Sequence, residues 1–256
     1  MTKHASSSRL RAELYALTHR GNSGDLEFYL RQARGAKRVL ELGCGSGRLL
    51  EKLCASKRAL AITGLDFDAD MLALARRNLR RMPTEQRARV RLEHADMRSF
   101  ILESRYERVF LPYNALYCLL TRRDALACLR AAHHALEPGG ELVLDVWNAE
   151  QFQRAASDGS DDAEPVAVIE HAGEVWDVFE HSRVRRASQR MHVVYEYLAR
   201  STGAIVESVI PQRYYLAPEL KDLLSRAGFS VTKAYGDFSE RRYTARSPHL
   251  ILIARA

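Results

Sequence analysis

The feature that most constrains this chain is a short apolar stretch that runs directly into closely spaced glycines. Residues 39–42 read as a buried parallel strand, and glycines follow at 43, 45 and 47. Residues 48–55 then carry leucines at helical spacing. Glycine permits positive φ and lets a ligand approach the backbone, and the start of a helix presents unpaired N–H groups. The stretch therefore predicts a strand, a turn and a helix that together bind a nucleotide-like ligand.

The spacing of the glycines indicates which ligand. The dinucleotide fingerprint is G-x-G-x-x-G, whereas this turn is G-x-G-x-G, so a nicotinamide dehydrogenase is a distant alternative. The turn, with an acidic residue two positions before its first glycine, resembles motif I of the class I S-adenosylmethionine-dependent methyltransferases. In that family the turn holds the methionine and ribose parts of the cofactor. The resemblance implies cofactor contacts by Glu41, Gly43, Cys44, Gly45 and Gly47.

Length and composition indicate one soluble α/β domain with an insertion. The chain has 256 residues, and no apolar run approaches the roughly 20 residues that span a bilayer. The N-terminus lacks the apolar core of a signal peptide, and the four cysteines form no C-x-x-C pair. We therefore expect a cytoplasmic protein with reduced thiols, no metal site and no membrane partner.

The net charge of +7 comes mainly from arginine, and four arginines fall close together on one predicted helix, at 76, 77, 80 and 81. Such a cluster can mark a nucleic-acid footprint or a solvated helix face. The second interpretation is favoured because basic residues occur along the whole chain, so nucleic acid is an unlikely partner. A basic surface could also attract an anionic small substrate.

The second predicted strand, residues 59–65, ends in an acidic residue that suits a ribose. A carboxylate can accept two hydrogen bonds from neighbouring hydroxyls, which is the role we expect for Asp66. Asp68 is expected to cap the following helix. Phe67 and Met71 are candidates to flank the adenine ring, since their place matches the pattern of the family after motif I.

The third strand, residues 90–95, ends in Asp96 and Met97. In the family that the chain resembles, an acidic residue here binds the adenine amino group, and the next backbone N–H faces the ring. Capping of a helix by Asp96 is a compatible structural role.

The fourth strand, residues 106–111, ends at the edge where open α/β sheets bind ligands. Pro112 cannot continue the ladder, so it forces a turn that aims Tyr113 and Asn114 over the cofactor. Nucleic-acid amino-methyltransferases carry (Asp/Asn)-Pro-Pro-(Tyr/Phe) here. This chain lacks the leading residue and the first proline, which argues against base methylation.

A helix over 121–136, a turn over 137–140 and a fifth strand over 141–146 complete this half of the sheet. The sequence Leu-x-Pro-Gly-Gly before the strand is another hallmark of the family. Residues 1–36 are expected to form lid helices, with Tyr15, His19 and Tyr29 as candidates to line the pocket or to pack the lid onto the sheet.

Residues 151–213 break the alternation of strands and helices. A loop over 155–164 and four strand-like segments predict an inserted antiparallel β meander, which would form a substrate roof, a contact in a homodimer or both. Val175, Asp177 and Phe179 alternate with Trp176, Val178 and Glu180. Neither set is cleanly apolar, so the inward face stays open.

The predicted fold is α/β: a three-layer αβα sandwich around a seven-stranded, mostly parallel sheet whose last strand is antiparallel. Residues 37–150 and 214–256 form this core. The resemblance covers nearly the whole chain and is strongest to small-molecule methyltransferases, among them sugar-amine N-methyltransferases with a β insert.

The expected reaction is in-line transfer of the methyl group of S-adenosylmethionine to an amine or hydroxyl of a small molecule. Tyr113 and Asn114 are the candidates to orient the nucleophile. Tyr15 and His19 are candidates to take its proton. Further candidate bases are Tyr117, His171, His181 and His192. Alternatives are methylation of RNA or protein, and a non-catalytic scaffold that binds the cofactor.

Overall fold

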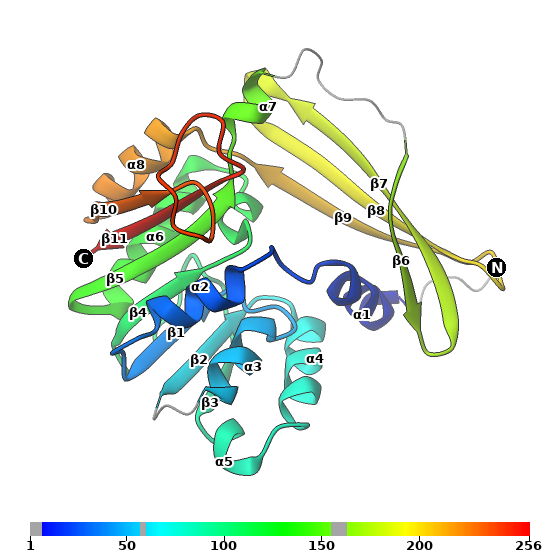
Figure 1. The fold of residues 1–256 in the computed structure, drawn as a ribbon, viewed down its shortest axis with the longest axis horizontal. Helices are drawn as coiled ribbons and strands as arrows, with labels where there is room; N and C mark the ends of the chain where they lie inside the picture. Colours follow the sequence, from blue (N-terminus) through cyan, green and yellow to red (C-terminus); the bar gives the residue numbers. More distant parts are fainter. Residues whose placement is uncertain (1–6, 57–59, 155–162) are drawn as a thin grey trace.

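The computed structural model describes residues 7–56, 60–154 and 163–256. Most of the loop predicted over 155–164 therefore lies outside the described residues. The chain forms two sheets that stand beside each other, with helices packed around the larger one (Figure 1).

The larger sheet has seven strands in the order β10-β11-β5-β4-β1-β2-β3. These are β1 (Arg38–Leu42), β2 (Ala61–Asp66), β3 (Val90–His94), β4 (Tyr106–Leu111), β5 (Leu136–Trp147), β10 (Ser230–Tyr235) and β11 (His249–Arg255). Only β11 runs antiparallel to its neighbours in this sheet, and the pairs among β1 to β5 are parallel. The predicted mostly parallel sheet is confirmed. Its strand order reverses between β1 and β4, which is where such sheets bind ligands.

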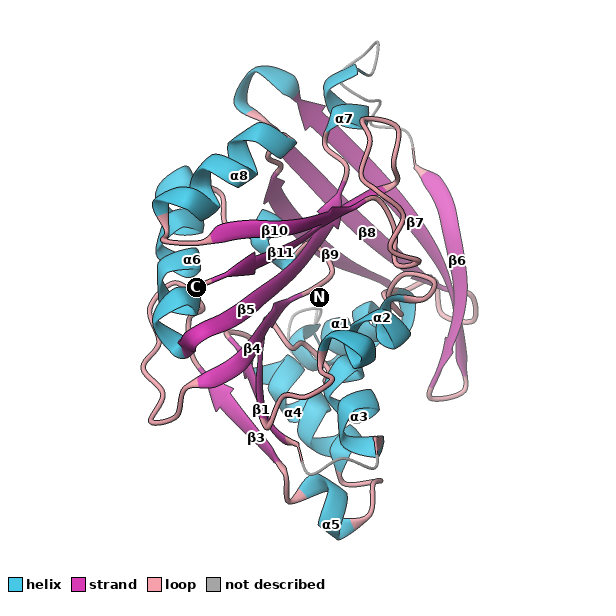
Figure 2. Cartoon of the chain, turned by 60° about the vertical axis from the view of Figure 1, so that its left-hand side comes forward, coloured by secondary structure: helices cyan, strands magenta, loops and turns pink. Residues whose placement is uncertain are grey.

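Helices cover both faces of this sheet (Figure 2). On one side lie α2 (Asp25–Gln32), α3 (Arg48–Ala55), α4 (Ala69–Leu79) and the short α5 (Thr84–Arg87); on the other lie α6 (Arg122–Ala135) and α8 (Ala217–Arg226). Alternation along β1 explains the layers: Val39 packs with the first group, and Leu40 and Leu42 belong to the core on the other side. The three-layer αβα prediction is confirmed.

The start of β5 differs from the prediction. We expected a turn over 137–140 before the strand, but the strand already begins at Leu136, which pairs with Tyr106. Arg108 then pairs with Glu141, so the intervening residues form an irregularity within the ladder. Gly139, with φ of 77°, supplies the backbone freedom for this bend. The predicted turn is therefore wrong as a break between elements, because the chain bends without leaving the sheet.

The smaller sheet is the inserted meander, preceded by α7 (Glu150–Arg154). Its four antiparallel strands follow in sequence order: β6 (Glu164–His171), β7 (Glu174–Arg185), β8 (Arg190–Ala199) and β9 (Ile205–Arg213). A single 3-10 turn, η2 (Arg186–Ser188), joins β7 to β8, and another, η1 (Ala115–Cys118), follows β4 in the core. The predicted antiparallel meander is confirmed.

Burial identifies the inner face of the meander. Trp176 and Val178 on β7 are buried, as are Tyr195 and Tyr197 on β8. The opposite face of this sheet carries exposed aliphatic side chains, which are Val166, Val168, Ile205 and Val209. The inner face packs against η1 and the first helix, so the insert covers the edge of the core where β4 ends.

The first helix, α1 (Ser7–Thr18), lies between the core and the insert, against α4, β6 and β9. Glu13 joins all three parts: its carboxylate accepts a hydrogen bond from Arg77 of α4, and its Oε2 lies 3.0 Å from Nε2 of His171 on β6. None of the helices in the described residues is both long and apolar enough to cross a bilayer.

Candidate functional site

The glycine turn has the backbone that its sequence predicts. Gly43, Gly45 and Gly47 all have positive φ, at 71°, 53° and 84°. A Cβ added to Gly43 would lie 3.2 Å from the Cβ of Ala115, and one added to Gly47 would lie 3.2 Å from the Cβ of Ala75. The backbone conformation therefore favours glycine at all three positions, and tight packing adds to this preference at Gly43 and Gly47.

Asp66 lies at the end of β2 and holds this turn in place. Its Oδ2 accepts the Gly45 N–H at 2.7 Å, and its Oδ1 accepts the Asp68 N–H at 2.8 Å. Burial raises the pKa of Asp66, while these N–H groups oppose the rise. Each carboxylate oxygen keeps a further lone pair for a hydroxyl. Asp68 caps α4 as expected, because its side chain accepts the N–H groups of Asp70 and Met71.

Glu41 is an unsatisfied carboxyl group in the core of the site. Its side chain is only 3% exposed, and its Oε2 has no hydrogen-bond partner among the described residues. Burial raises the pKa of Glu41 well above its ordinary value, and the positive charge of Arg48 partly opposes this. A buried polar atom without a partner is costly, so a ligand that donates a hydrogen bond here would remove the cost.

Arg48, the first residue of α3, anchors the segment before α2. Its guanidinium forms two hydrogen bonds to the buried Asp25, at 2.9 and 2.7 Å. The guanidinium also lies so close to Gly21 that a Cβ there would be 2.3 Å from its central carbon. Sequence analysis did not find this pair, because a contact between residues 23 positions apart leaves no local pattern.

The turn after β4 has two consecutive strained residues. Tyr113 and Asn114 have φ of 55° and 61°, a left-handed region that is costly for a tyrosine and better tolerated by an asparagine. Asp145 of β5 holds both: its Oδ1 accepts the Tyr113 N–H at 3.0 Å, and its backbone oxygen accepts the Asn114 N–H at 3.1 Å. Asn114 Oδ1 in turn accepts the Trp147 N–H at 2.6 Å. Asn114 is thus buried, and both its side chain and its N–H are hydrogen-bonded to the backbone of β5. Its role in orienting the nucleophile stays a prediction.

Asp145 also connects α2 to this turn. The Tyr29 hydroxyl donates to Asp145 Oδ1 at 2.5 Å, so α2, β5 and the strained turn meet at one carboxyl group. Asp145 is 2% exposed, and burial raises its pKa to about 6. Sequence analysis missed this residue because it lies inside an otherwise apolar strand, where an acidic residue is the only signal.

The predicted adenine contacts lie at the neighbouring strand ends. The side chain of Phe67 is 73% exposed, which is unusual for a large apolar ring. Asp96 accepts several hydrogen bonds from Arg98, which lower its pKa. Met71 and Met97 are partly exposed beside them. Pro112 is buried directly before the strained turn. Their contacts with a cofactor stay predictions.

An aromatic cluster joins the end of α1, the core and the insert. His19 stacks on Tyr15 with centroids 3.8 Å apart, meets Tyr195 of β8 edge-on at 4.5 Å, and lies 6.4 Å from Tyr113. Arg48 lies 5.9 Å from the Tyr113 ring, so the cluster adjoins the glycine turn. The structure thus brings together Tyr15, His19 and Tyr113, and adds Tyr195, which sequence analysis did not select.

The protonation of His19 follows from its surroundings. Its Nδ1 lies 3.0 Å from the Tyr15 carbonyl oxygen, which can only accept, so Nδ1 carries a proton. Burial lowers the pKa of His19, although that hydrogen bond and the nearby Glu180 carboxylate oppose the change. At neutral pH the ring is therefore mostly neutral, with Nε2 as a basic atom.

The remaining predicted bases lie apart from this cluster. The Tyr117 hydroxyl is buried and donates to the Trp147 carbonyl at 2.8 Å. His171 pairs with Glu13, and His181 and His192 lie on the outer face of the insert. All four cysteines are free, and only Cys118 is exposed. Among the described residues, no group of three His, Cys, Asp or Glu side chains is arranged to hold a metal ion.

Comparison with known proteins agrees with this geometry. Residues 39–140 match a family described as a methyltransferase domain. A dTDP-3-amino-3,6-dideoxy-alpha-D-glucopyranose N,N-dimethyltransferase of Streptomyces fradiae is 34% identical over 145 residues. That match covers 53% of this chain and 52% of the relative, about half of each.

Two solved structures match over most of the chain. The CcbJ methyltransferase of Streptomyces caelestis superposes with a TM-score of 0.79 at 26% identity, covering 91% of this chain and 88% of that one. SAM-bound CalS10, an amino pentose methyltransferase of Micromonospora echinaspora, superposes with a TM-score of 0.68 at 25% identity, covering 96% of each chain.

The residues present fit S-adenosylmethionine as the cofactor. The unpartnered oxygen of Glu41 can accept a hydrogen bond from the methionine ammonium group, and Asp66 keeps lone pairs for the ribose hydroxyls. The glycine turn lets the cofactor approach the backbone. From its fold, its glycine turn and these matches, we conclude that residues 39–140 resemble a methyltransferase domain and that the whole chain resembles class I S-adenosylmethionine-dependent methyltransferases, among them the sugar-amine N-methyltransferases.

Proposed function

We propose that this protein transfers the methyl group of S-adenosylmethionine to an amine nitrogen of a small molecule of the amino-sugar class. Two of the matched proteins support this acceptor by their names, one as an N,N-dimethyltransferase of a dTDP-amino sugar and one as an amino pentose methyltransferase. The cofactor supplies an electrophilic methyl group on a sulfonium. The protein must then position the acceptor and remove a proton from it.

The observation that carries the proposal is the neutral His19 within the aromatic cluster. An amine is largely an ammonium ion at neutral pH, so it must lose a proton before its lone pair can attack the methyl group. Nε2 of His19 can accept that proton. An alcohol holds its proton far more tightly, and a histidine of lowered pKa is a poor base for it.

The surroundings of His19 also suit a cationic acceptor. The rings of Tyr113 and Tyr195 lie beside His19, and the negative π density of tyrosine faces attracts ammonium groups. Glu180 lies opposite Tyr195 in the β7–β8 ladder and adds a carboxylate on the inner face. In this proposal the insert is a substrate roof, because it contributes Tyr195 and Glu180 to the space in front of the cofactor.

A pair of acceptors tests the choice of atom. We would incubate the protein with S-adenosylmethionine and either a nucleotide-linked 3-amino sugar or its 3-hydroxy counterpart, and measure methylated sugar by mass spectrometry. Methylation of the amino sugar alone is expected. Methylation of the hydroxy sugar would overturn the proposal. Binding of S-adenosylhomocysteine without methyl transfer to any of a panel of amines would also overturn it, and would favour a non-catalytic scaffold.

The role of His19 is tested by the pH profile. Because its pKa is lowered, the neutral ring should persist into mildly acidic solution, and kcat/KM should fall only when the pH drops below that pKa. His19→Gln should remove this acidic limb and lower kcat about 100-fold, within the usual range for loss of a general base. His134→Gln on α6 is a control outside the cluster. An unchanged profile would exclude His19 as the base.

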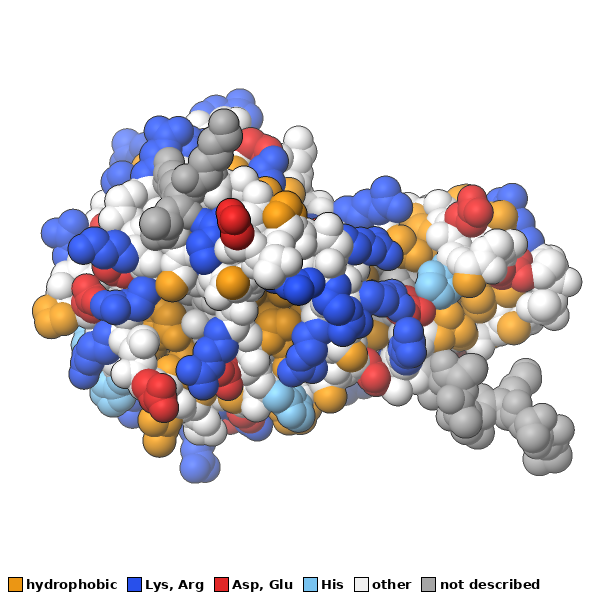
Figure 3. All heavy atoms as spheres, turned by 90° about the horizontal axis from the view of Figure 1, so that it is seen from below, with side chains coloured by type: hydrophobic (Ala, Val, Ile, Leu, Met, Phe, Trp, Pro, Cys, Tyr) orange, Lys and Arg blue, Asp and Glu red, His pale blue; other side chains and the backbone are white. Residues whose placement is uncertain are grey.

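RNA and protein are the competing acceptors suggested by the net charge. Lys and Arg side chains are spread over the face in Figure 3, with acidic and apolar side chains between them, as a general solvated surface has. The tRNA fraction of a cell extract, added to the same assay, should therefore remain unmethylated. Association of two copies through the insert stays a prediction, which sedimentation measurements would decide.

A further inference from the structure

The outer face of the insert carries a row of arginines across three neighbouring strands. Arg185 of β7 lies directly opposite Arg190 of β8, and Arg190 lies directly opposite Arg213 of β9. In the adjacent position on the same face, Arg183 lies opposite His192. Like charges directly opposite each other destabilise an antiparallel ladder. This arrangement therefore creates a concentrated positive field that an anion would neutralise.

The described residues supply few partners for Arg185, Arg190 and Arg213, whereas Arg183 has an interaction partner. In the described part of the chain, the side chains of Arg185 and Arg190 make no hydrogen bond or ion pair, whereas Arg213 donates to Gln189 Oε1 at 3.4 Å and lies over the Tyr215 ring at 5.6 Å. The acidic residues of the β8–β9 outer face, Glu196 and Glu207, face each other at the other half of the sheet. Glu196 lies four positions from His192, about 13 Å along a strand.

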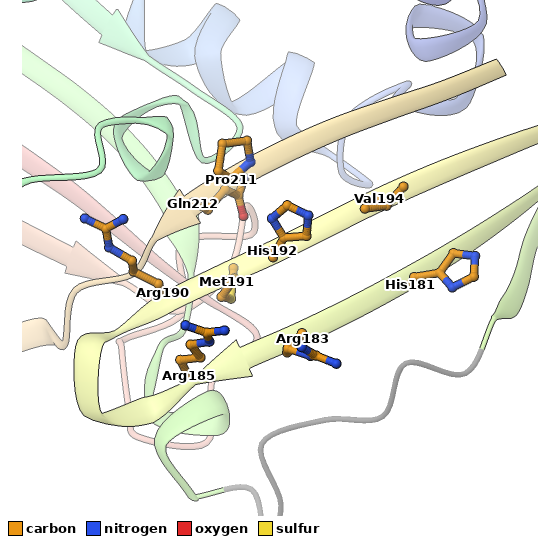
Figure 4. Close-up of a pocket in the computed structure, with 9 residues that line it drawn as sticks. All are labelled: His181, Arg183, Arg185, Arg190, Met191, His192, Val194, Pro211 and Gln212. Atoms are coloured by element: carbon orange, nitrogen blue, oxygen red, sulfur yellow. The ribbon is translucent and has the colours of Figure 1, made fainter.

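A hollow of about 480 Å³ lies at these arginines (Figure 4). One part of its lining consists of arginine and histidine side chains, which are His181, Arg183, Arg185, Arg190 and His192. The other part is uncharged and consists of Met191, Val194, Pro211 and Gln212. The volume lies in the range of small-ligand pockets, about 300–1,000 Å³. The hollow thus has room for a small molecule with both charged and uncharged parts.

This hollow is separate from the space where methyl transfer is proposed. Side chains alternate along a strand, so Arg183 and His181 point away from the side of β7 that carries Glu180. Likewise, His192 and Val194 point away from the side of β8 that carries Tyr195. The outer hollow and the aromatic cluster lie on opposite faces of one sheet.

We propose that the outer hollow binds a small ligand through a diphosphate or triphosphate group, such as a nucleoside diphosphate. Arginine forks bind phosphate oxygens in pairs, and adjacent phosphates match arginines presented side by side on neighbouring strands. The apolar floor formed by Val194 and Pro211 then contacts the uncharged part of the ligand. The occupant is a small ligand because Arg183, Arg185 and Arg190 line one hollow, whereas a nucleic acid needs an extended basic track.

Calorimetric titration of the full chain with inorganic pyrophosphate, and then with ADP, tests this site. Binding should weaken about tenfold or more in R185Q/R190Q, because two charge-assisted contacts are lost. R185K/R190K, which keeps the charges but not the forks, should fall between this variant and the unchanged protein. R76Q/R80Q, in the last turn of α4 and at the residue that caps it, removes the same charge from exposed positions and should bind normally.

S-adenosylhomocysteine affinity, measured on the same samples, should be equal in all variants and shows that each one is folded. Equal pyrophosphate affinity in R185Q/R190Q and the unchanged protein would overturn the proposal. An equal loss in R76Q/R80Q would do so too, because it would indicate only nonspecific charge attraction. Absence of pyrophosphate binding together with tight binding of an RNA oligonucleotide, or burial of this face by a second copy, would likewise refute it.

Discussion

Asp145 gives the sharpest prediction about stability, because a buried carboxylate should cost the fold free energy that an amide would not. Its pKa rises from 3.8 to about 6 on folding, mainly through burial. A difference of about 2 in pKa corresponds to about 3 kcal/mol. Asp145→Asn keeps Oδ1 as an acceptor for Tyr29 and Tyr113, but weakens these hydrogen bonds by about 1 kcal/mol. The variant should therefore be more stable by about 2 kcal/mol above pH 7.

The pH dependence follows from the direction of the pKa change. Below 3.8 the carboxyl group is protonated in both states and imposes no penalty. Between 3.8 and about 6 the folded state binds more protons than the unfolded state, so the unchanged protein loses stability as the pH rises. Above about 6 the full penalty is present. The advantage of Asp145→Asn should therefore grow between pH 4 and 6 and stay constant above.

Urea unfolding of both proteins between pH 4.5 and 8 measures this difference. Asp222→Asn is the control, since that carboxylate is exposed on α8 and its ion pairs with Arg122 and Arg226 should matter by less than about 1 kcal/mol. If Asp145→Asn is less stable than the unchanged protein by the same amount at every pH, the carboxylate carries no burial penalty. The argument from its environment would then be refuted.

Three further changes test other parts of the structure. Gly47→Ala should destabilise the protein by about 1–2 kcal/mol, because φ is 84° and the new Cβ would press on Ala75. Unfolding by denaturant measures the free energy of unfolding of both proteins, and equal values would contradict the prediction. Glu41→Leu removes the unpartnered carboxyl group, so calorimetry should show weaker binding of S-adenosylhomocysteine, by about tenfold, with no loss of stability. Glu13→Gln should speed hydrogen exchange in α1, because Arg77 and His171 lose their shared carboxylate; equal exchange rates would mean that packing alone holds the helix.

The core of the fold could be predicted because its signals are local. The spacing of Gly43, Gly45 and Gly47 predicts a turn with positive φ at these positions. Asp66 could be selected because it directly follows a clear apolar strand. Capping of α4 by Asp68 likewise depends only on its own helix. The parallel sheet follows from strands that alternate with helices.

The remainder depends on contacts between distant residues. Asp145 meets Tyr29 from 116 positions away, and neither residue carries a pattern that names the other. Alternation along β7 did not identify its inner face, because each face carries a large aromatic residue, Trp176 on one and Phe179 on the other. Only the packing of the insert against α1 and η1 shows which face is buried. Tyr195 could not be selected from the sequence, because its contact with His19 forms only when the insert packs over the core.

Titration of the purified protein with S-adenosylhomocysteine, compared with Asp66→Ala and with the control Asp70→Ala, tests the central assignment most directly. The account predicts saturable heat at one site per chain, a loss of about 2 kcal/mol of binding free energy in Asp66→Ala, and unchanged binding in Asp70→Ala. Absence of binding to the unchanged protein, or equal affinity in Asp66→Ala, would contradict the placement of the cofactor on the glycine turn.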